Sequence, residues 1–221
     1  KTVVGLIMLQ SCLNEEKGPA IYVVPDNYLV KQVIDEAKRL GISATEDKDD
    51  YSYSNSKAIL VTSIQTIVNG YSYFGMREGG NYPIGSIIID DVHACMDKII
   101  SQFMIKIDAE SDAYKELIAI FSSSLKDYNP KNYIDIVEMK DCRKKMLVPY
   151  WEWQRQQDNI YRILTKYDNS KNSAIYFGLP LIERSLETSD CIITASAIEI
   201  SPKGIDLDKI SSLEEASRRI Y

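Results

Sequence analysis

The residues best suited to chemistry stand together in the stretch "IIIDDVHAC", residues 87–95. An apolar run leads directly into Asp90 and Asp91, and His93, the only histidine of the chain, follows. Two adjacent carboxylates at the tip of a buried strand repel one another, so they need a counterion, and hydrated Mg²⁺ bridging nucleotide phosphates is the usual one. One carboxylate then holds the ion while the other orients or deprotonates an attacking water. A simpler interpretation is that the pair only caps the next helix.

A second chemical signal stands at the first two residues. Lys1 and Thr2 directly precede the apolar stretch 3–13, which we predict to be a buried helix, apolar around most of its circumference. A Lys followed by Ser or Thr ends the phosphate-binding loop GxxxxGK[ST], in which Lys reaches the terminal phosphates and the hydroxyl binds Mg²⁺. The glycines of that loop do not precede them here, so the pair gains meaning only from its position. Because the sequence starts with Lys inside this pattern, we expect it to be part of a longer chain.

The elements that must position these residues follow from the apolar pattern. Three short apolar runs are typical of strands buried on both faces of a parallel sheet, and they cover residues 20–25, 58–63 and 86–90. Helical spacing from Asn27 to Leu40, with Gly41 as the stop, and a short helix over 64–70 follow the first two runs, while 43–57 reads as surface loop. We therefore predict an α/β fold with a doubly wound, mostly parallel sheet. Its carboxyl edge, where ligands bind in such sheets, holds Asp90 and Asp91.

The remainder of the chain has a different pattern. Helical spacing dominates residues 98–190, which we interpret as a largely helical insertion, although 132–139 and 191–200 have an extended pattern. Residues 191–221 are expected to return to the first sheet, ending in a short helix and a strand. The predicted domains are therefore a core over 1–97, the insertion over 98–190, and the return over 191–221.

The composition is that of an ordinary globular protein. The net charge of −6 argues against a surface that clamps phosphate backbone throughout, although a local groove can still be basic. The four cysteines lack metal-ligand spacing, so neither zinc nor an iron–sulfur cluster is expected. No apolar run approaches the roughly 20 residues that span a bilayer, so we expect a cytoplasmic protein without membrane contact.

Taken in order, the segments resemble the first RecA-like domain of superfamily 2 helicases, the DEAD/DEAH-box group. "KT" at 1–2 matches the end of motif I, "AIYVVPDNYLVKQVIDEAKRLGI" at 20–42 is similar to motif Ia, and "AILVTSIQTIVNG" at 58–70 resembles the motif Ib/Ic region. "IIIDDVH" at 87–93 resembles motif II in its D-E-x-H form. The resemblance covers residues 1–97 and implies a RecA-like P-loop NTPase fold, ATP and Mg²⁺ as ligands, and DNA or RNA as partner.

The resemblance also implies a role for each matching residue. Lys1 and Thr2 would contact the phosphates and Mg²⁺, and Asp90 would position the ion. Asp91 replaces the usual glutamate general base; it is one methylene shorter, so the attacking water would have to lie closer. His93 would take the position that couples the phosphate site to motif III and the partner domain. Without the resemblance, His93 is more simply a structural residue at a helix start.

A nucleic-acid contact is implied at two turns of the same edge. The family's P-T-R-E-L appears here as "PDNYL" at 25–29, so an arginine contact to phosphate is missing. Beyond the next strand, hydroxyl and amide groups offer further donors, for which helix capping is an equally good explanation. The implied contact residues are Pro25, Asp26, Asn27, Thr62, Ser63 and Gln65.

The motor function depends on parts beyond these motifs. "TASA" at 194–197 resembles motif III, S-A-T, only superficially, and we expect the true motif just after "RRIY" at 218–221, followed by a second RecA-like domain. This part alone is not expected to be an active motor. The alternatives are another P-loop ATPase without strand-separating activity, or a degenerate nucleic-acid or protein-binding module. In the insertion, Trp151, Trp153 and Arg155 have two interpretations. They either bind single-stranded nucleic acid, with bases stacked on the tryptophans, or they belong to a packed core and a solvent-exposed helix face.

Overall fold

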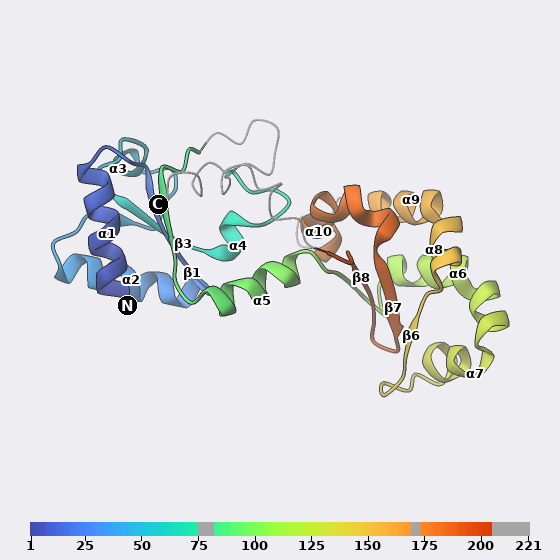
Figure 1. Ribbon diagram of the computed structural model, residues 1–221. Helices are drawn as coiled ribbons and strands as arrows, with labels where there is room; N and C mark the ends of the chain where they lie inside the picture. Colours follow the sequence, from blue (N-terminus) through green and yellow to red (C-terminus); the bar gives the residue numbers. More distant parts are fainter. Residues whose placement is uncertain (75–81, 169–172, 205–221) are drawn as a thin grey trace. The chain divides into compact units, whose positions relative to one another are not determined.

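The computed structural model describes residues 1–74, 82–168 and 173–204, which form two compact units (Figure 1). The first unit contains the described residues up to Ser101, and the second contains those from Gln102 onward. The boundary expected between residues 97 and 98 lies inside helix α5 (Val92–Gln102), because the apolar spacing of this helix continues through Ile99.

The first unit is built on a four-stranded parallel sheet. Its strand order is β2-β3-β1-β4, and every neighbouring pair is parallel. The strands are β2 (Ala44–Thr45), β3 (Ile59–Ser63), β1 (Ala20–Val24) and β4 (Ser86–Ile89). The helices besides α5 are α1 (Thr2–Asn14), α2 (Asn27–Arg39), α3 (Tyr51–Ser54) and α4 (Ile64–Ile67). The predicted α/β class and parallel sheet are confirmed. The expected loop over 43–57 differs, since it contains β2 and α3, and the helix expected over 64–70 ends at Ile67.

Strand β1 lies inside this sheet, and all five of its residues are buried. Burial on both faces explains why its sequence is apolar apart from the Tyr22 hydroxyl. On one face, α1 and α2 pack against Ala20, Tyr22 and Val24. Because side chains alternate along a strand, Ile21 and Val23 point to the other face, where they are also fully buried. Gly41 ends the α2 segment with a left-handed φ of 69°, as the sequence predicts.

Helix α1 is less buried than its sequence suggests. Leu6, Leu9 and Leu13 face the core, but Val4, Ile7 and Met8 are more than half exposed among the residues that the structure describes. A helix that is apolar on all sides carries no sign of which side faces inward, so the expectation of burial around most of its circumference was wrong.

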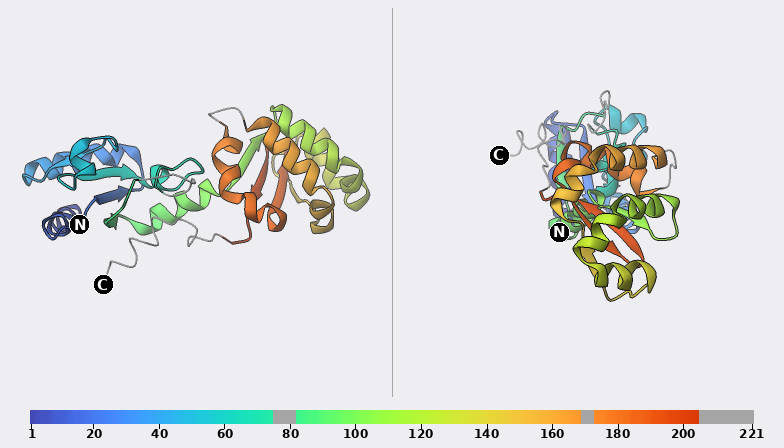
Figure 2. Two further views of the ribbon diagram at one scale, coloured as in Figure 1. Left: turned by 90° about the horizontal axis from the view of Figure 1, so that it is seen from above. Right: turned by 90° about the vertical axis from the view of Figure 1, so that its right-hand side faces the viewer.

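The second unit contains a four-stranded antiparallel sheet with helices packed against it (Figure 2). The order is β5-β8-β7-β6, with β5 (Ile105–Asp108), β8 (Ala197–Ser201), β7 (Asp190–Thr194) and β6 (Lys145–Leu147). Its helices are α6 (Asp112–Tyr128), α7 (Pro130–Tyr133), the π-helix Ile134–Glu138, α8 (Tyr150–Arg155), α9 (Gln157–Tyr167), α10 (Ala174–Ile182) and the 3₁₀ helix Glu183–Thr188.

Two expectations about this unit were wrong. The extended pattern over 132–139 is helical, because Pro130 at the first helical position and the Asn129 side chain, which accepts from the Asn132 backbone N–H at 3.2 Å, start a helix there. The described part of 191–221 does not rejoin the parallel sheet: β7 and β8 pair with each other, and "TASA" makes their turn. The expected final helix and strand lie outside the described residues.

A buried carboxylate ties the helices of the second unit together. Glu152 is 1% exposed, and its side chain accepts hydrogen bonds from Ser124, Arg155 and Gln156 at 2.8, 2.9 and 3.1 Å. Burial by itself would raise the pKa of Glu152, but these hydrogen bonds and the charge of Arg155 outweigh it, so the pKa is lowered. The ionised Glu152 carboxylate therefore stabilises the fold above the ordinary pKa of a glutamate, and this stabilisation is lost as the pH falls through the lowered pKa of Glu152.

We expect Arg155→Met to destabilise the chain at pH 7 by about 3 kcal/mol, because it leaves a buried carboxylate without its cation. The deficit should shrink as the pH falls below the ordinary pKa of a glutamate, because the carboxyl can then protonate. Urea unfolding followed by tryptophan fluorescence measures this, since both tryptophans lie in the second unit. Arg162→Met is a matched control, because the exposed Arg162 guanidinium donates to the uncharged side chain of Asn159 at 2.8 Å. Equal losses for both variants, or a loss independent of pH, would contradict the role of the ion pair.

In the part of the chain that the structure describes, none of the helices combines the length and apolarity needed to cross a membrane.

Candidate nucleotide site

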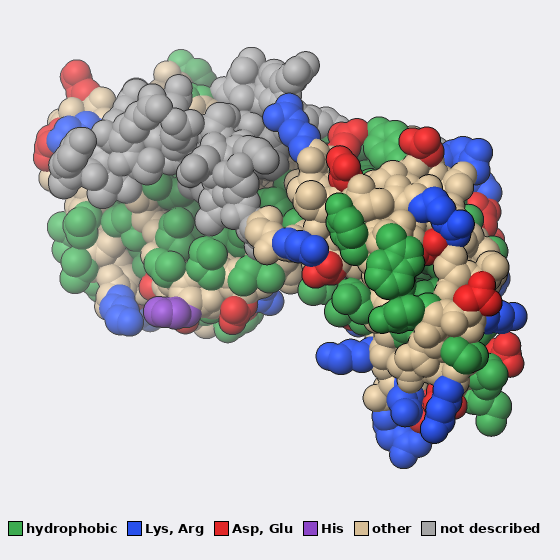
Figure 3. All heavy atoms as spheres, turned by 45° about the vertical axis from the view of Figure 1, so that its right-hand side comes forward, with side chains coloured by type: hydrophobic (Ala, Val, Ile, Leu, Met, Phe, Trp, Pro, Cys, Tyr) green, Lys and Arg blue, Asp and Glu red, His purple; other side chains and the backbone are tan. Residues whose placement is uncertain are grey.

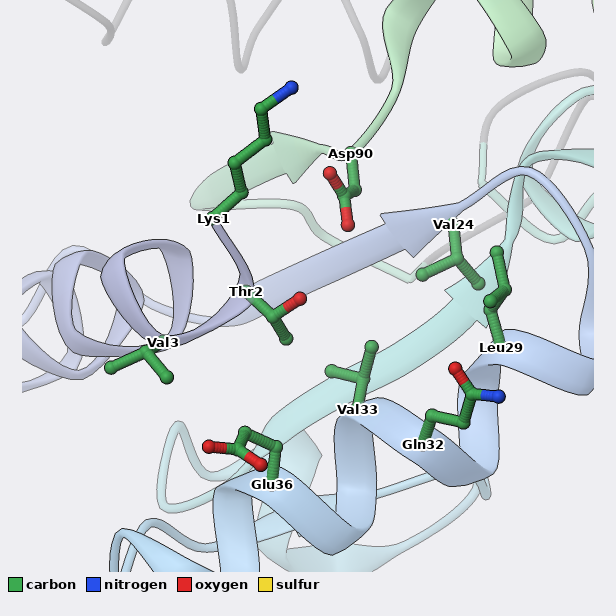
Figure 4. Close-up of a pocket in the computed structure, with 9 residues that line it drawn as sticks. All are labelled: Lys1, Thr2, Val3, Val24, Leu29, Gln32, Val33, Glu36 and Asp90. Carbon is green, nitrogen blue, oxygen red and sulfur yellow. The ribbon is translucent and has the colours of Figure 1, made fainter.

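The two chemical signals of the sequence meet at one cavity of the first unit. Lys1 and Thr2 lie at the start of α1, and Asp90 directly follows β4. The cavity measures about 380 Å³ and lies where strand β1 ends at Val24 (Figure 4). Its lining is Lys1, Thr2, Val3, Val24, Leu29, Gln32, Val33, Glu36 and Asp90. Residues that are about ninety positions apart along the chain thus share one hollow at the carboxyl edge of the sheet.

Asp90 is held by both its backbone and its side chain. Its N–H donates to the Val23 carbonyl at 2.8 Å, and its own carbonyl accepts from the Cys95 thiol at 3.3 Å. The Asp90 carboxylate accepts from the Tyr22 hydroxyl at 3.1 Å. Burial raises the pKa of Cys95 to about 11, so this thiol stays protonated and keeps its donor. The carboxylate is therefore placed by strand pairing, by α5 and by Tyr22.

Tyr22 links the start of α1 to the end of β4. Its hydroxyl donates to the Asp90 carboxylate at 3.1 Å, and the Thr2 side chain lies near enough to the same hydroxyl to affect its pKa. Burial raises the pKa of Tyr22 to about 12; Thr2 opposes this rise, and the nearby Asp90 charge adds to it. The phenol is therefore neutral at physiological pH and remains a donor. Figure 4 shows the Thr2 hydroxyl and the Asp90 carboxylate directed toward one another.

The chemistry of the lining suits a magnesium-bound phosphate chain. Lys1 supplies an ammonium group and is the N-cap of α1, whose N-terminal backbone N–H groups carry partial positive charge. Thr2 and Asp90 supply a hydroxyl and a carboxylate, which are oxygen ligands of the kind Mg²⁺ takes. The volume is at the low end of the range of ligand cavities, about 300–1,000 Å³. The residues present thus fit the predicted group.

A bare metal ion has less support than a nucleotide-bound one. Within the described ranges, no three imidazole, thiol or carboxyl groups gather where a metal could bind. Mg²⁺ is commonly held by one or two carboxylates together with substrate phosphates. An ion at Thr2 and Asp90 would therefore have to share its coordination with phosphate oxygens.

Asp91 and His93 lie outside this cavity in the structure. Asp91 is exposed and has a left-handed φ of 48°, and its carboxylate accepts from the Ala94 backbone N–H at 3.3 Å at the start of α5. It thus makes the helix-capping contact that the sequence offered as the simpler explanation. The single histidine, His93, is exposed at the surface (Figure 3, purple). Of the three expected catalytic residues, only Asp90 lines the cavity.

The residues expected to contact nucleic acid are only partly brought together. Asn27 and Thr62 line a second cavity of about 380 Å³ next to β3. Acidic residues of the 46–49 loop line the same cavity: Glu46, Asp47 and Asp49, together with Lys48. Lys48 pairs with Asp49 at 2.6 Å and lies over the Tyr73 ring. Three carboxylates here oppose a phosphate backbone, so this edge is less favourable for nucleic acid than the motifs alone suggest.

The other expected contact residues have structural partners or lie deeper. Asp26 forms an ion pair with Lys98 of α5 at 2.9 Å, and Pro25 is buried. Ser63 is buried as the N-cap of α4, where its hydroxyl lies 3.3 Å from that of Thr66. Gln65 is half-buried in α4 and, like these three, is not among the described residues that line the second cavity.

In the second unit, the aromatic and basic residues expected to grip a strand divide into two kinds. Trp153 is 2% exposed and donates to the Leu186 carbonyl at 2.9 Å, so it belongs to the core. Arg155 pairs with Glu152. Trp151, in contrast, is 61% exposed, and its ring meets that of Tyr128 edge to face.

Sequence reasoning missed Tyr22, Gln32 and Glu36. Gln32 and Glu36 lie four residues apart and therefore share one face of α2. Only the packing of α2 in the structure shows that this face lines the cavity. Tyr22 had a signal that could have been used, since it is the one residue with a polar atom in the side chain within "AIYVV". A buried tyrosine normally finds a partner for its hydroxyl.

Comparison with known proteins supports the order of motifs. The family model described as "Type III restriction enzyme, res subunit" matches residues 1–134, which is more than half of the chain. None of the curated proteins or solved structures compared with the chain matches it. The matched region contains the whole parallel sheet and the cavity at the start of α1. The chain therefore belongs to the family of type III restriction enzyme res subunits, a helicase-like superfamily 2 family of ATP-binding domains.

Proposed function

We propose that the chain is the Mg²⁺-ATP-binding motor domain of a nucleic-acid helicase or translocase, which couples ATP hydrolysis to movement on or unwinding of DNA or RNA. The observation that carries this proposal is the shared cavity of Lys1, Thr2 and Asp90. Family membership adds to it, because the matched residues contain all three.

In this proposal each cavity residue has a distinct task. The Lys1 ammonium group and the α1 N-terminus bind the terminal phosphates, and Thr2 and Asp90 hold Mg²⁺. When bound, the ion neutralises charge that develops on the transferred phosphoryl group. Asp91 acts as the base for the attacking water, and His93 passes the state of the site to a proposed second RecA-like domain. Both residues would have to approach the nucleotide when it binds, because neither lines the cavity in the structure.

Nucleic acid is proposed to bind along the turns after β1 and β3. Asn27 and Thr62 are the best-placed donors, since they line one cavity. Pro25, Asp26, Ser63 and Gln65 would support that edge. The exposed ring of Trp151 in the second unit offers an additional surface on which a base can stack.

A second candidate function is favoured by one observation, the capping contact of Asp91. With its carboxylate engaged by the Ala94 N–H, the site can bind ATP without an efficient base for hydrolysis. The chain would then be a nucleotide-responsive binding module. Both the motor and the binding module bind ATP, but only the motor hydrolyses it efficiently.

The deciding experiment measures ATP binding and ATP hydrolysis by the intact protein, with and without DNA or RNA. The motor predicts hydrolysis stimulated by nucleic acid, and the binding module predicts binding without turnover. Lys1→Ala is expected to weaken ATP binding about 10-fold, the worth of a charge-assisted hydrogen bond of about 1.5 kcal/mol. Lys31→Ala, an exposed lysine of α2 outside the cavity lining, is the matched control. Unchanged binding after Lys1→Ala would contradict both functions.

A further inference from the structure

We propose that Tyr22 is a positioning residue of the magnesium–nucleotide site, whose hydroxyl orients Asp90 beside Thr2 in the cavity. This inference rests on the proposed function, since it concerns the same ligand. It adds a residue that the phosphate-binding and acidic motifs do not contain.

The ring of Tyr22 is held tightly between α1 and β4. Tyr22 is 1% exposed and pairs in register with Ile88 of the neighbouring strand. A Cβ atom at Gly5 would lie 2.8 Å from Cε2 of the Tyr22 ring and 3.5 Å from Cγ2 of Ile88. Glycine weakens a helix interior, yet here any larger residue would displace the ring. The packing thus leaves the hydroxyl one position, between the start of α1 and the end of β4.

The direction of the Tyr22 hydrogen bond leaves the expected metal ligands available. Tyr22 donates to Oδ2 of Asp90, which leaves the other carboxylate oxygen available to a cation. Thr2 lines the same cavity, and its hydroxyl oxygen has lone pairs that the same cation can use. The hydrogen bond from Tyr22 therefore fixes the carboxylate without occupying the oxygen that would bind the metal.

A purely structural role for the Tyr22 hydroxyl makes a different prediction. If the Tyr22 hydroxyl served only to provide a hydrogen-bond partner inside the fold, its removal would lower the free energy of unfolding without changing metal affinity. Outer-shell partners that orient metal ligands typically change metal affinity 10–100-fold. Metal affinity is therefore the measurement that separates the two roles.

The test compares wild type and Tyr22→Phe in the intact protein, with ADP as the nucleotide so that turnover plays no part. Mn²⁺ is titrated in the presence of ADP and followed by electron paramagnetic resonance, and ADP binding is measured by calorimetry with Mg²⁺ and with EDTA. We expect Mn²⁺ affinity in the ADP complex to fall about 10-fold. ADP affinity in EDTA should be unchanged, because Phe keeps the ring that packs on Gly5.

Tyr53→Phe is the matched control. Tyr53 is also a fully buried tyrosine of the first unit, and its hydroxyl donates to the Pro83 carbonyl at 3.2 Å, away from the cavity lining. Its loss removes one buried hydroxyl and one hydrogen bond, so stability should fall while Mn²⁺ affinity stays that of wild type.

Wild-type Mn²⁺ affinity in Tyr22→Phe, or equal weakening in both variants, would overturn the positioning role while leaving the proposed function standing. Failure of the wild type to bind ADP under any condition would overturn the proposed function and this inference with it. If Tyr22→Phe does not fold, 3-fluorotyrosine at position 22 gives a second measurement. Its ¹⁹F resonance should shift when Mg²⁺ is added to the ADP complex, and an unmoved resonance would overturn the role.

Discussion

Asp90→Asn is expected to weaken Mg²⁺-dependent ATP binding by at least about 100-fold, because Asp90 is the direct metal ligand in the proposed site and even outer-shell partners contribute 10–100-fold. The substitution is nearly isosteric, and the asparagine carbonyl can still accept the hydrogen bond from Tyr22. What is lost is the negative charge that Mg²⁺ requires beside the phosphates. Calorimetric titration of ATP with Mg²⁺ and with EDTA measures the effect, which should be confined to the Mg²⁺ series.

The cavity itself offers a control for this substitution. Glu36 is a second carboxylate in the lining, but it comes from α2 and pairs with Arg39 at 3.3 Å. Glu36→Gln should leave the Mg²⁺ dependence in place. If Asp90→Asn binds ATP as wild type does in both series, or if Glu36→Gln causes the larger loss, Asp90 is not the metal ligand and the proposed site is wrong.

Asp91→Asn is expected to lower kcat for ATP hydrolysis about 100-fold, the low end of what a general base contributes. Asparagine can cap α5 through the Ala94 N–H and tolerates the left-handed φ of 48°. The change therefore removes the base while the local structure is kept. ATP affinity should not change, because Asp91 does not line the cavity. Steady-state phosphate release in the presence of nucleic acid measures this.

The comparison variant for Asp91 is Asp97→Asn, which replaces an exposed aspartate within α5, the helix that Asp91 precedes. It should keep the wild-type kcat. Full activity in Asp91→Asn would show that Asp91 is only a helix cap, in which case either another residue supplies the base or the chain is the nucleotide-responsive module. If Asp91→Asn does lower kcat, Asp91→Glu becomes informative, since a rise in kcat above that of wild type would mean that the shorter side chain limits turnover.

Strands β1, β3 and β4 and helices α1 and α2 could be predicted because their signals are local, whereas β2 and α3 were missed. The apolar run 20–24, the helical spacing from Asn27 and the stop at Gly41 each depend on neighbours within a few residues. The meeting of Lys1 and Thr2 with Asp90 was expected from the resemblance of both segments to the motifs of one phosphate site, and the carboxyl edge of the parallel sheet located Asp90. Chemistry that is tied to an element's end can thus be located before any coordinates exist.

Other features depend on contacts between distant residues, and the sequence carried little sign of them. The short strands β5 and β6 form in the second unit because β8 and β7 supply their hydrogen-bonding partners. The exposed side of α1 and the acidic lining beside Asn27 likewise depend on which surfaces the fold brings together. Tyr22 and Asp90 are 68 positions apart, and a hydrogen bond between them exists only because β1 and β4 pair in one register. Local pattern sets the type of each element, whereas the partners of a buried hydroxyl are set by packing across the sheet.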